Sequence, residues 1–151
     1  SQYIHRDICP RNYICTQDLK TVKLIDFGLT VPATKPFMQP GNRTGTPLYM
    51  SPEIVRRRTT DQRVDIFSFG VTCYHLLTFQ LPWPITDTTG MAALHHDTSP
   101  PTPILDYRPD LDRNLASAVM AAMRSNVNER TADMETFLRQ IRSSKSEFAA
   151  T

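Results

Sequence analysis

The segment 62–80 constrains the fold more than any other feature, because it is apolar on every side when it is wound as an α-helix. Its apolar residues are Val64, Ile66, Phe67, Phe69, Val71, Cys73, Leu76, Leu77 and Phe79. A helix that is apolar all round is a buried one, so other elements must cover it. Asp61 is placed to cap its start, and Pro82 to stop it. We therefore expect a buried central helix over 61–80.

Shorter elements are expected before and after this helix. Two runs rich in β-forming residues, 13–15 and 21–25, are separated by a short polar stretch and predict a small hairpin. The segment 29–52 is rich in proline and has no sustained periodicity, which predicts a long functional loop. Residues 91–95 form a short helical candidate.

Helical spacing returns toward the C-terminal end. The apolar positions that follow it are Leu111, Leu115, Val119, Ala122, Met123, Met134, Phe137, Leu138 and Ile141. Thr131 is placed to cap the last of these helices. One hairpin followed mostly by helices puts the chain in the α+β class, with helix predominating.

Charge and cysteine content exclude several classes of protein. The formal net charge of +2 is too small to favour nucleic acid or an anionic membrane as a partner. No apolar stretch approaches the roughly 18 residues that span a bilayer. The three cysteines, Cys9, Cys15 and Cys73, form no CxxC pair, which suits a reducing compartment. We therefore expect a cytoplasmic protein, and these observations leave open a membrane anchor preceding Ser1.

Three short motifs follow one another along the chain. They are H-R-D-x-x-x-x-N at 5–12, D-F-G at 26–28 and S-P-E at 51–53. In this order they resemble the signature set of the eukaryotic-type protein kinases, and the resemblance covers essentially the whole chain. It implies the large C-terminal lobe of the protein kinase fold over 1–151, without the N-terminal lobe. The expected parts are the catalytic loop 1–12, hairpin 13–25, activation segment 26–53, central helix 61–80 and C-terminal helices 111–145.

The resemblance implies the chemistry of phosphoryl transfer from ATP to serine or threonine hydroxyls of a protein substrate. Asp7 would accept the proton of the acceptor hydroxyl. Asn12 and Asp26 would hold the Mg²⁺ ions that bridge the phosphates, since both side chains offer the oxygen ligands this cation prefers. Thr46, in a stretch that resembles the peptide-docking loop of serine/threonine kinases, would orient the acceptor. Without the motif set, Asp7 and Asp26 would be read as turn residues.

Three further residues are expected to shape the Asp-Phe-Gly turn. His5 resembles a structural histidine that packs under it. Gly28 would let the backbone turn sharply after Asp26, and Phe27 would pack inward as an apolar contact.

Other expected roles belong to the scaffold. Glu53 resembles a carboxylate that pairs with a buried arginine, and Arg130 sits in the matching context. A buried pair of this kind would be expensive to break. Asp65 would hold the backbone of the catalytic loop, and Phe67 replaces the tryptophan usual in that helix motif.

Regulation is expected at the loop between the D-F-G and S-P-E motifs. Thr44 is a candidate phosphorylation site, and Arg6 resembles the arginine that receives a phosphorylated activation loop; its alternative is an exposed arginine paired with a local carboxylate. The run 56–58 of three arginines could recognise an anion, but a solvated helix end is favoured. His95, His96 and Asp97 are likewise expected at a solvated helix end rather than in a metal site.

One position departs from the family pattern. Serine/threonine kinases generally carry a lysine two residues after the catalytic Asp, where this chain has Cys9. Arg11 lies where tyrosine kinases place an arginine, and we expect it to compensate in part. Cys9 is expected to be a small buried side chain. A pseudokinase that binds without catalysing, and a tyrosine-specific kinase, are the alternatives.

The chain has no Gly-rich loop and no phosphate-binding lysine on a strand. We expect these to belong to an N-terminal lobe preceding Ser1 that supplies most of the ATP pocket. The 151 residues alone are therefore expected to be inactive and to have no useful affinity for ATP.

Overall fold

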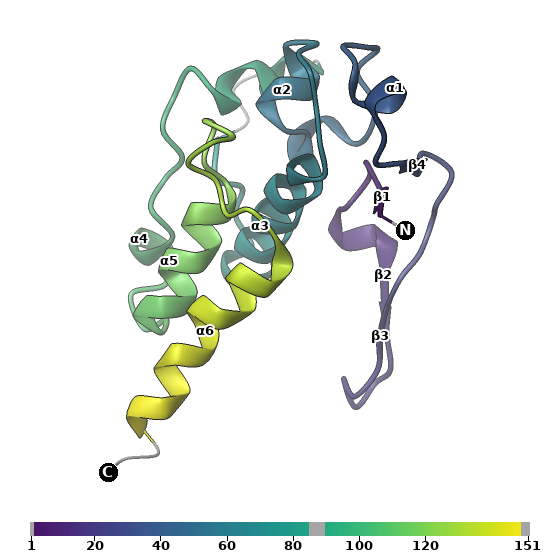
Figure 1. Ribbon diagram of the computed structural model, residues 1–151. Helices are drawn as coiled ribbons and strands as arrows, with labels where there is room; N and C mark the ends of the chain where they lie inside the picture. The colour runs from purple at the N-terminus through teal and green to yellow at the C-terminus, as the bar shows by residue number, and fades with distance from the viewer. Residues whose placement is uncertain (1, 85–89, 149–151) are drawn as a thin grey trace.

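The computed structural model describes residues 2–84 and 90–148, and a helical part lies beside a thinner strand-bearing N-terminal part (Figure 1). The strands are β1 (Tyr3–Ile4), β2 (Tyr13–Cys15), β3 (Val22–Leu24) and β4 (Val31–Pro32). The α-helices are α1 (Lys35–Met38), α2 (Pro52–Val55), α3 (Arg63–Thr78), α4 (Ile104–Tyr107), α5 (Arg113–Ala122) and α6 (Met134–Phe148). Three 3-10 helices are η1 (Pro10–Asn12), η2 (Pro47–Tyr49) and η3 (Gly90–His96).

Helix α3 lies at the centre of the helical part, and its burial confirms the expectation for most of its length. Phe67, Val71 and Tyr74 are fully buried. The backbone of Gly70 lies so close to α5 that a Cβ there would be 2.9 Å from the Cβ of Ala122. A glycine is therefore needed at this position, because any side chain would separate the two helices.

The ends of α3 differ from the expectation. The helix ends at Thr78, four positions before the expected stop at Pro82, because Phe79 adopts a left-handed backbone (φ 55°). Leu76 and Phe79 are 57% and 82% exposed, so the last turn is not surrounded by protein. At the other end Asp61 does not occupy the cap position, although its carboxylate accepts the N–H of Arg63 at 2.8 Å.

The N-terminal part contains two separate two-stranded sheets. Strands β2 and β3 form the expected hairpin, with Tyr13 opposite Leu24. Strands β1 and β4 pair antiparallel, with Ile4 opposite Val31. The long loop expected over 29–52 contains three short elements that were not predicted, β4, α1 and η2. These elements are too short to leave a periodic signal in the sequence.

The C-terminal helices are confirmed, but the predicted cap is wrong. Asp133, not Thr131, caps α6 by accepting the N–H of Thr136 at 2.7 Å. The helix begins after Asp133, and the hydroxyl of Thr131 is buried with no hydrogen-bond partner in the described structure. Phe137 of α6 packs edge-on against Phe69 of α3, with ring centroids 5.2 Å apart. Among the described helices, none combines the length and hydropathy needed to cross a bilayer.

Candidate active site

The carboxylate of Asp7 is the centre of a compact group of polar side chains. The hydroxyl of Thr46 donates to Asp7 Oδ1 at 2.8 Å, although the two residues are 39 positions apart. Arg11 Nη2 donates to that hydroxyl at 2.9 Å and lies 3.5 Å from Asp7 Oδ2. Asp7 is buried, whereas the Arg11 side chain is 66% exposed. The arrangement presents a proton-accepting oxygen, a hydroxyl and an exposed cation at one place.

Asn12 joins this group through its amide nitrogen. Its Nδ2 donates to the backbone oxygen of Asp7 at 2.7 Å and to Asp7 Oδ2 at 3.2 Å. Two acceptors on one nitrogen fix the orientation of the amide. The amide oxygen therefore faces away from Asp7, and no donor within 2–84 or 90–148 bonds to it.

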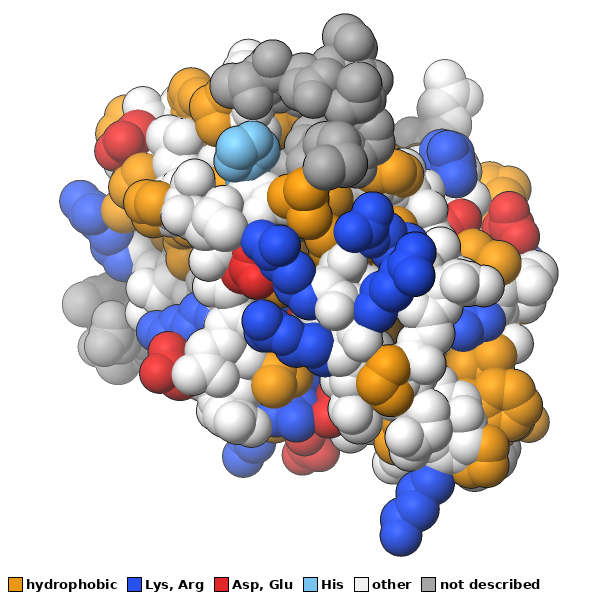
Figure 2. Space-filling view, turned by 90° about the horizontal axis from the view of Figure 1, so that it is seen from above, with side chains coloured by type: hydrophobic (Ala, Val, Ile, Leu, Met, Phe, Trp, Pro, Cys, Tyr) orange, Lys and Arg blue, Asp and Glu red, His pale blue; other side chains and the backbone are white. Residues whose placement is uncertain are grey.

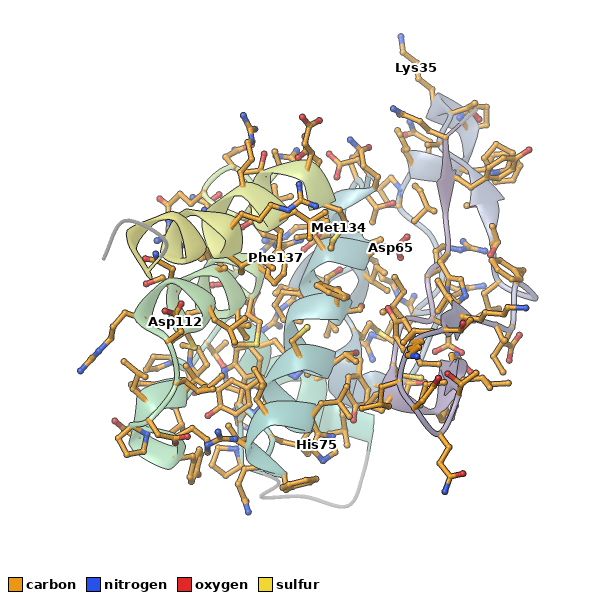
Figure 3. The ribbon with its side chains drawn as sticks, turned by 90° about the horizontal axis from the view of Figure 1, so that it is seen from below. Lys35, Asp65, His75, Asp112, Met134 and Phe137 are labelled. Atoms are coloured by element: carbon orange, nitrogen blue, oxygen red, sulfur yellow. The ribbon has the colours of Figure 1, made fainter. Side chains whose placement is uncertain are left out.

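The loop that carries Asp7 is attached to the central helix by one carboxylate. Asp65, on the side of α3 that faces the N-terminal part (Figure 3), accepts the N–H of His5 at 2.7 Å and of Arg6 at 2.9 Å. Burial raises the pKa of Asp65, and the two backbone bonds oppose this effect. The contact that we expected for Asp65 is therefore present.

His5 connects the loop to the Asp-Phe-Gly turn. Its Nδ1 accepts the N–H of Asp7 at 3.1 Å, so its Nε2 carries a proton, which it donates to the Ile25 carbonyl at 3.0 Å. The ring also contacts Phe27 edge-on, with centroids 5.3 Å apart.

One expectation for the Asp-Phe-Gly turn is wrong. Phe27 is 62% exposed rather than packed inward. Among the described aromatic side chains, only that of His5 contacts its ring. The left-handed backbone lies at Asp26 (φ 61°) and not at Gly28. Gly28 instead allows a close approach, since its N–H donates to Asp26 Oδ1 and a Cβ there would be 3.3 Å from that oxygen.

The donor set fits a hard divalent cation. Asn12 has a free amide oxygen, as described above, and the Asp26 carboxylate is exposed. The backbone brings the two residues together, because the N–H of Ile25 donates to the Asn12 carbonyl at 2.8 Å. Oxygen ligands of this kind suit Mg²⁺. Asp7 and Asn12 are in direct contact, whereas Asp26 reaches them through this backbone link.

Glu53 and Arg130 form a buried bidentate ion pair. Arg130 Nη1 bonds Glu53 Oε1 at 2.5 Å, and Nη2 bonds Oε2 at 2.9 Å. The other three N–H groups of the guanidinium donate to the carbonyl oxygens of Arg63, Arg124 and Ser125. This contact joins α2 to the turn before α6, as the sequence led us to expect.

Cys9 is buried, with 1% of its surface exposed, as expected for a small packing residue. Its Sγ lies 3.9 Å from the hydroxyl of Thr46. A cysteine side chain supplies no cation beside Asp7. In the described structure Arg11 is the residue that places a guanidinium there.

The solvated helix end expected for 95–97 is present at His95, which is exposed, but is wrong for His96. His96 is buried, its ring lies tilted against Trp83 with centroids 4.4 Å apart, and its Nδ1 bonds the Met50 carbonyl at 2.8 Å. Asp97 pairs with Arg56 at 2.8 Å. The remaining two arginines of 56–58 are exposed.

Two contacts that hold the loop with Thr46 were not predicted. The Ser68 hydroxyl donates to the Tyr49 carbonyl at 2.6 Å, and His96 bonds the next carbonyl, that of Met50. Ser68 stands three positions after Asp65 in a motif of α3, so its spacing was the available signal. His96 offered none, because η3 is far from the loop in sequence.

Comparison with known proteins identifies a family that matches most of the chain. The family described as "Protein kinase domain" matches residues 1–142. Mitogen-activated protein kinase kinase kinase 8 of Rattus norvegicus is 34% identical over 131 residues, covering 84% of this chain and 27% of that protein. Serine/threonine-protein kinase PknL of Mycobacterium tuberculosis is 37% identical over 130 residues, covering 85% and 29%.

A third relative is named for a different substrate residue. Tyrosine-protein kinase MasK of Myxococcus xanthus is 32% identical over 137 residues, covering 89% of this chain and 21% of that protein. The chain thus spans between 21% and 29% of the length of these three relatives.

Proposed function

The chain belongs to the protein kinase family, and on that premise we propose that the full-length protein transfers the γ-phosphoryl group of ATP to serine and threonine hydroxyls of protein substrates. The observation that carries this proposal is the contact of Asp7, Thr46 and Arg11. It puts a proton acceptor beside a hydroxyl-binding residue and a cation, which phosphoryl transfer requires.

In this proposal Asp7 Oδ1 accepts the proton of the acceptor hydroxyl. The Thr46 hydroxyl, which now donates to that oxygen, marks the place of the acceptor and orients it. Asn12 donates to the other carboxylate oxygen, Asp7 Oδ2, through its amide nitrogen, which helps to orient Asp7. Arg11 stabilises negative charge that develops on the transferred group.

Asn12 and Asp26 would hold Mg²⁺, and the ion would supply charge neutralisation to the phosphates when bound. We assign the chain to the C-terminal lobe, with 1–12 as the catalytic loop and 26–53 as the activation segment. ATP would be held mainly by an N-terminal lobe. Three free cysteines support a place in the reducing cytoplasm.

Thr44 is the proposed regulatory phosphorylation site, and Arg6 its partner. Thr44 is half-buried and lines a surface hollow together with Arg6, which supports this assignment. Mass spectrometry of the active full-length protein checks it: we expect phosphate on Thr44, and its absence would remove the assignment.

A pseudokinase is the second candidate function, and the burial of Cys9 favours it. The chain lacks the lysine cation that serine/threonine kinases generally place here. We favour catalysis because packing alone does not require Asp7, Asn12 and Asp26 together.

The test is phosphorylation of three peptides that differ only in a Ser, Thr or Tyr acceptor, using the full-length protein. We expect transfer to Ser and Thr, and none in an Asp26→Ala variant. Asp18→Ala is the matched control, because it removes an exposed carboxylate at the hairpin turn. Transfer to Tyr alone would establish the tyrosine-specific alternative, and transfer to none would establish the pseudokinase.

A further inference from the structure

The C-terminal end of α3 presents an exposed aromatic ring on an unfavourable backbone. Phe79 is 82% exposed, and its φ of 55° lies in the left-handed region, which is strained for a bulky residue. Its N–H closes the last turn of the helix on the His75 carbonyl at 2.8 Å. Glycine is the usual residue where a helix ends in this way. A phenylalanine there is strained and gains little from burial, which indicates that its ring has a role other than stabilising the fold.

Phe79 forms one wall of an open hollow of about 330 Å³, a size within the usual range of ligand pockets. The described residues that line this space, the Phe79 hollow, are His75, Phe79, Gln80, Leu81, Pro84 and Tyr107. Tyr107 is 43% exposed, and its ring packs edge-on against the buried ring of Tyr74, with centroids 6.4 Å apart. The hollow therefore has one aromatic wall that is held by the core and one that projects into solvent.

The Phe79 hollow lacks permanently charged side chains. Among the described residues that line it there is no Asp, Glu, Lys or Arg. Lys and Arg side chains gather on the face of the molecule seen in Figure 2, but none of them lines this hollow. An occupant therefore gains from apolar contact rather than from ion pairing, which favours a bulky aliphatic or aromatic side chain.

A short series of contacts connects the hollow to the candidate active site. His75, near the C-terminal end of α3 (Figure 3), bonds the hydroxyl of Tyr49 through Nδ1 at 2.7 Å. The two rings stack, with centroids 6.3 Å apart. Tyr49 is buried, and its N–H donates to the Thr46 carbonyl at 2.9 Å. Two side chains therefore separate the hollow from the residue whose hydroxyl contacts Asp7.

We propose that the Phe79 hollow receives one bulky apolar side chain of the protein substrate and so sets a sequence preference near the acceptor hydroxyl. An extended peptide advances about 3.3 Å per residue, so a residue a few positions from the acceptor reaches the hollow. The connection through Tyr49 to Thr46 favours the substrate over a second copy of this chain, because only the substrate has to lie at Thr46. The proposal rests on the proposed function, which it deepens by naming the chemistry of a substrate side chain.

The test measures binding of a peptide library to the full-length protein, without ATP. Each peptide carries alanine in place of the acceptor, and one flanking position at a time is Phe, Leu, Ala, Asp or Lys. We expect one position at which Phe and Leu lower Kd at least about tenfold relative to Ala. Asp and Lys at that position should give no such gain.

Phe79→Gly should abolish this preference without lowering the melting temperature, because glycine suits the left-handed turn. Leu19→Gly is the matched control. Leu19 is 70% exposed and is also left-handed, with φ 58°, but it belongs to the turn between β2 and β3. Its replacement should leave the preference unchanged.

The proposal is overturned if no position prefers Phe or Leu, if the preference survives in Phe79→Gly, or if Leu19→Gly removes it as well. It is also overturned if Phe79→Gly changes the oligomeric state but not peptide binding, since the occupant is then a second copy of the chain. Binding without ATP does not require phosphoryl transfer. A protein that shows the preference but phosphorylates no peptide therefore supports the hollow and refutes the proposed catalysis, whereas phosphorylation without any preference does the reverse.

Discussion

Among single residues, Arg11 is the one whose chemistry depends most on its neighbours. It is exposed, yet its guanidinium bonds Thr46 and lies beside Asp7. Cys9, which is buried next to Thr46, leaves this position without any other cation in the described structure. The effect of removing Arg11 therefore distinguishes a catalytic role from a surface one.

We predict that Arg11→Ala lowers kcat of the full-length protein by about 10- to 100-fold, because it removes a donor aimed at developing charge. The melting temperature should not change, since the side chain is 66% exposed. Initial rates at saturating ATP check this. Lys20→Ala, which removes an exposed cation of the hairpin turn, is the control and should keep the parental rate. An unchanged rate in Arg11→Ala would refute the role.

Single residues also show what the sequence could and could not predict. The resemblance named Asp7, Asn12 and Thr46, which the structure brings into contact or near it. It misplaced Phe27, because burial depends on what covers a residue and the motif says nothing about that.

Among the elements, α3 and the turn before α6 each hold one segment near the candidate site in place. Asp65 of α3 holds the loop that carries Asp7, and Arg130 holds Glu53 at the start of α2. Apolar periodicity predicted α3, but its ends depend on particular turns, such as the left-handed Phe79. The cap of α6 was misassigned for a related reason: Asp133 and Thr131 both suit a cap, and only the packed helix selects between them.

Breaking the Glu53–Arg130 pair should destabilise the fold strongly. The Arg130 side chain is fully buried, so Arg130→Met leaves the Glu53 carboxylate without its partner. We expect the free energy of unfolding to fall by about 3–5 kcal/mol, measured by urea denaturation. Arg139→Met, on the exposed side of α6, should change it by less than about 0.5 kcal/mol. Equal losses of unfolding free energy in the two variants would show that the buried pair contributes no more to stability than an exposed arginine does.

The contact between His96 of η3 and the Met50 carbonyl should make stability depend on pH. Burial lowers the pKa of His96, which bonds the Met50 carbonyl. A lowered pKa means that the unfolded chain binds the proton more readily. The stabilising contribution of His96 is therefore present above its ordinary pKa of about 6.5 and is lost as the pH falls through the folded value.

We accordingly expect the melting temperature to fall between about pH 7.5 and 5.5, and His96→Phe to flatten this dependence. His95→Asn is the control, because His95 is exposed and its loss should leave the slope unchanged. If both variants keep the parental pH dependence of the melting temperature, His96 is not the source of that dependence.

Across the whole molecule, the strand-bearing part exposes apolar surface that the helical part does not cover. Tyr3 and Phe27 are about equally exposed, at 60% and 62%. Together with Ile8 and Leu24 they line an open hollow of about 490 Å³. Ile14 and Val22 of the hairpin are exposed as well. No composition or motif argument predicted this face, because it depends on how the elements are placed.

We predict that the isolated 151-residue chain binds Mg–ATP more weakly than about 1 mM, since an open apolar face encloses a nucleotide on one side only. Isothermal titration calorimetry checks this, with the full-length protein as the positive control. Tight binding by the isolated chain would contradict the expectation that a second lobe completes the pocket.

The guanidinium of Arg130 uses all five of its N–H groups, two on Glu53 and three on backbone carbonyls. A lysine ammonium has three donors on a flexible stem and cannot reproduce this planar fork. A saturation mutagenesis screen should therefore reject lysine at this position about as firmly as alanine. Substitution scores that rank Arg and Lys as near equivalents will misjudge variants here, because shape rather than charge is what the site selects.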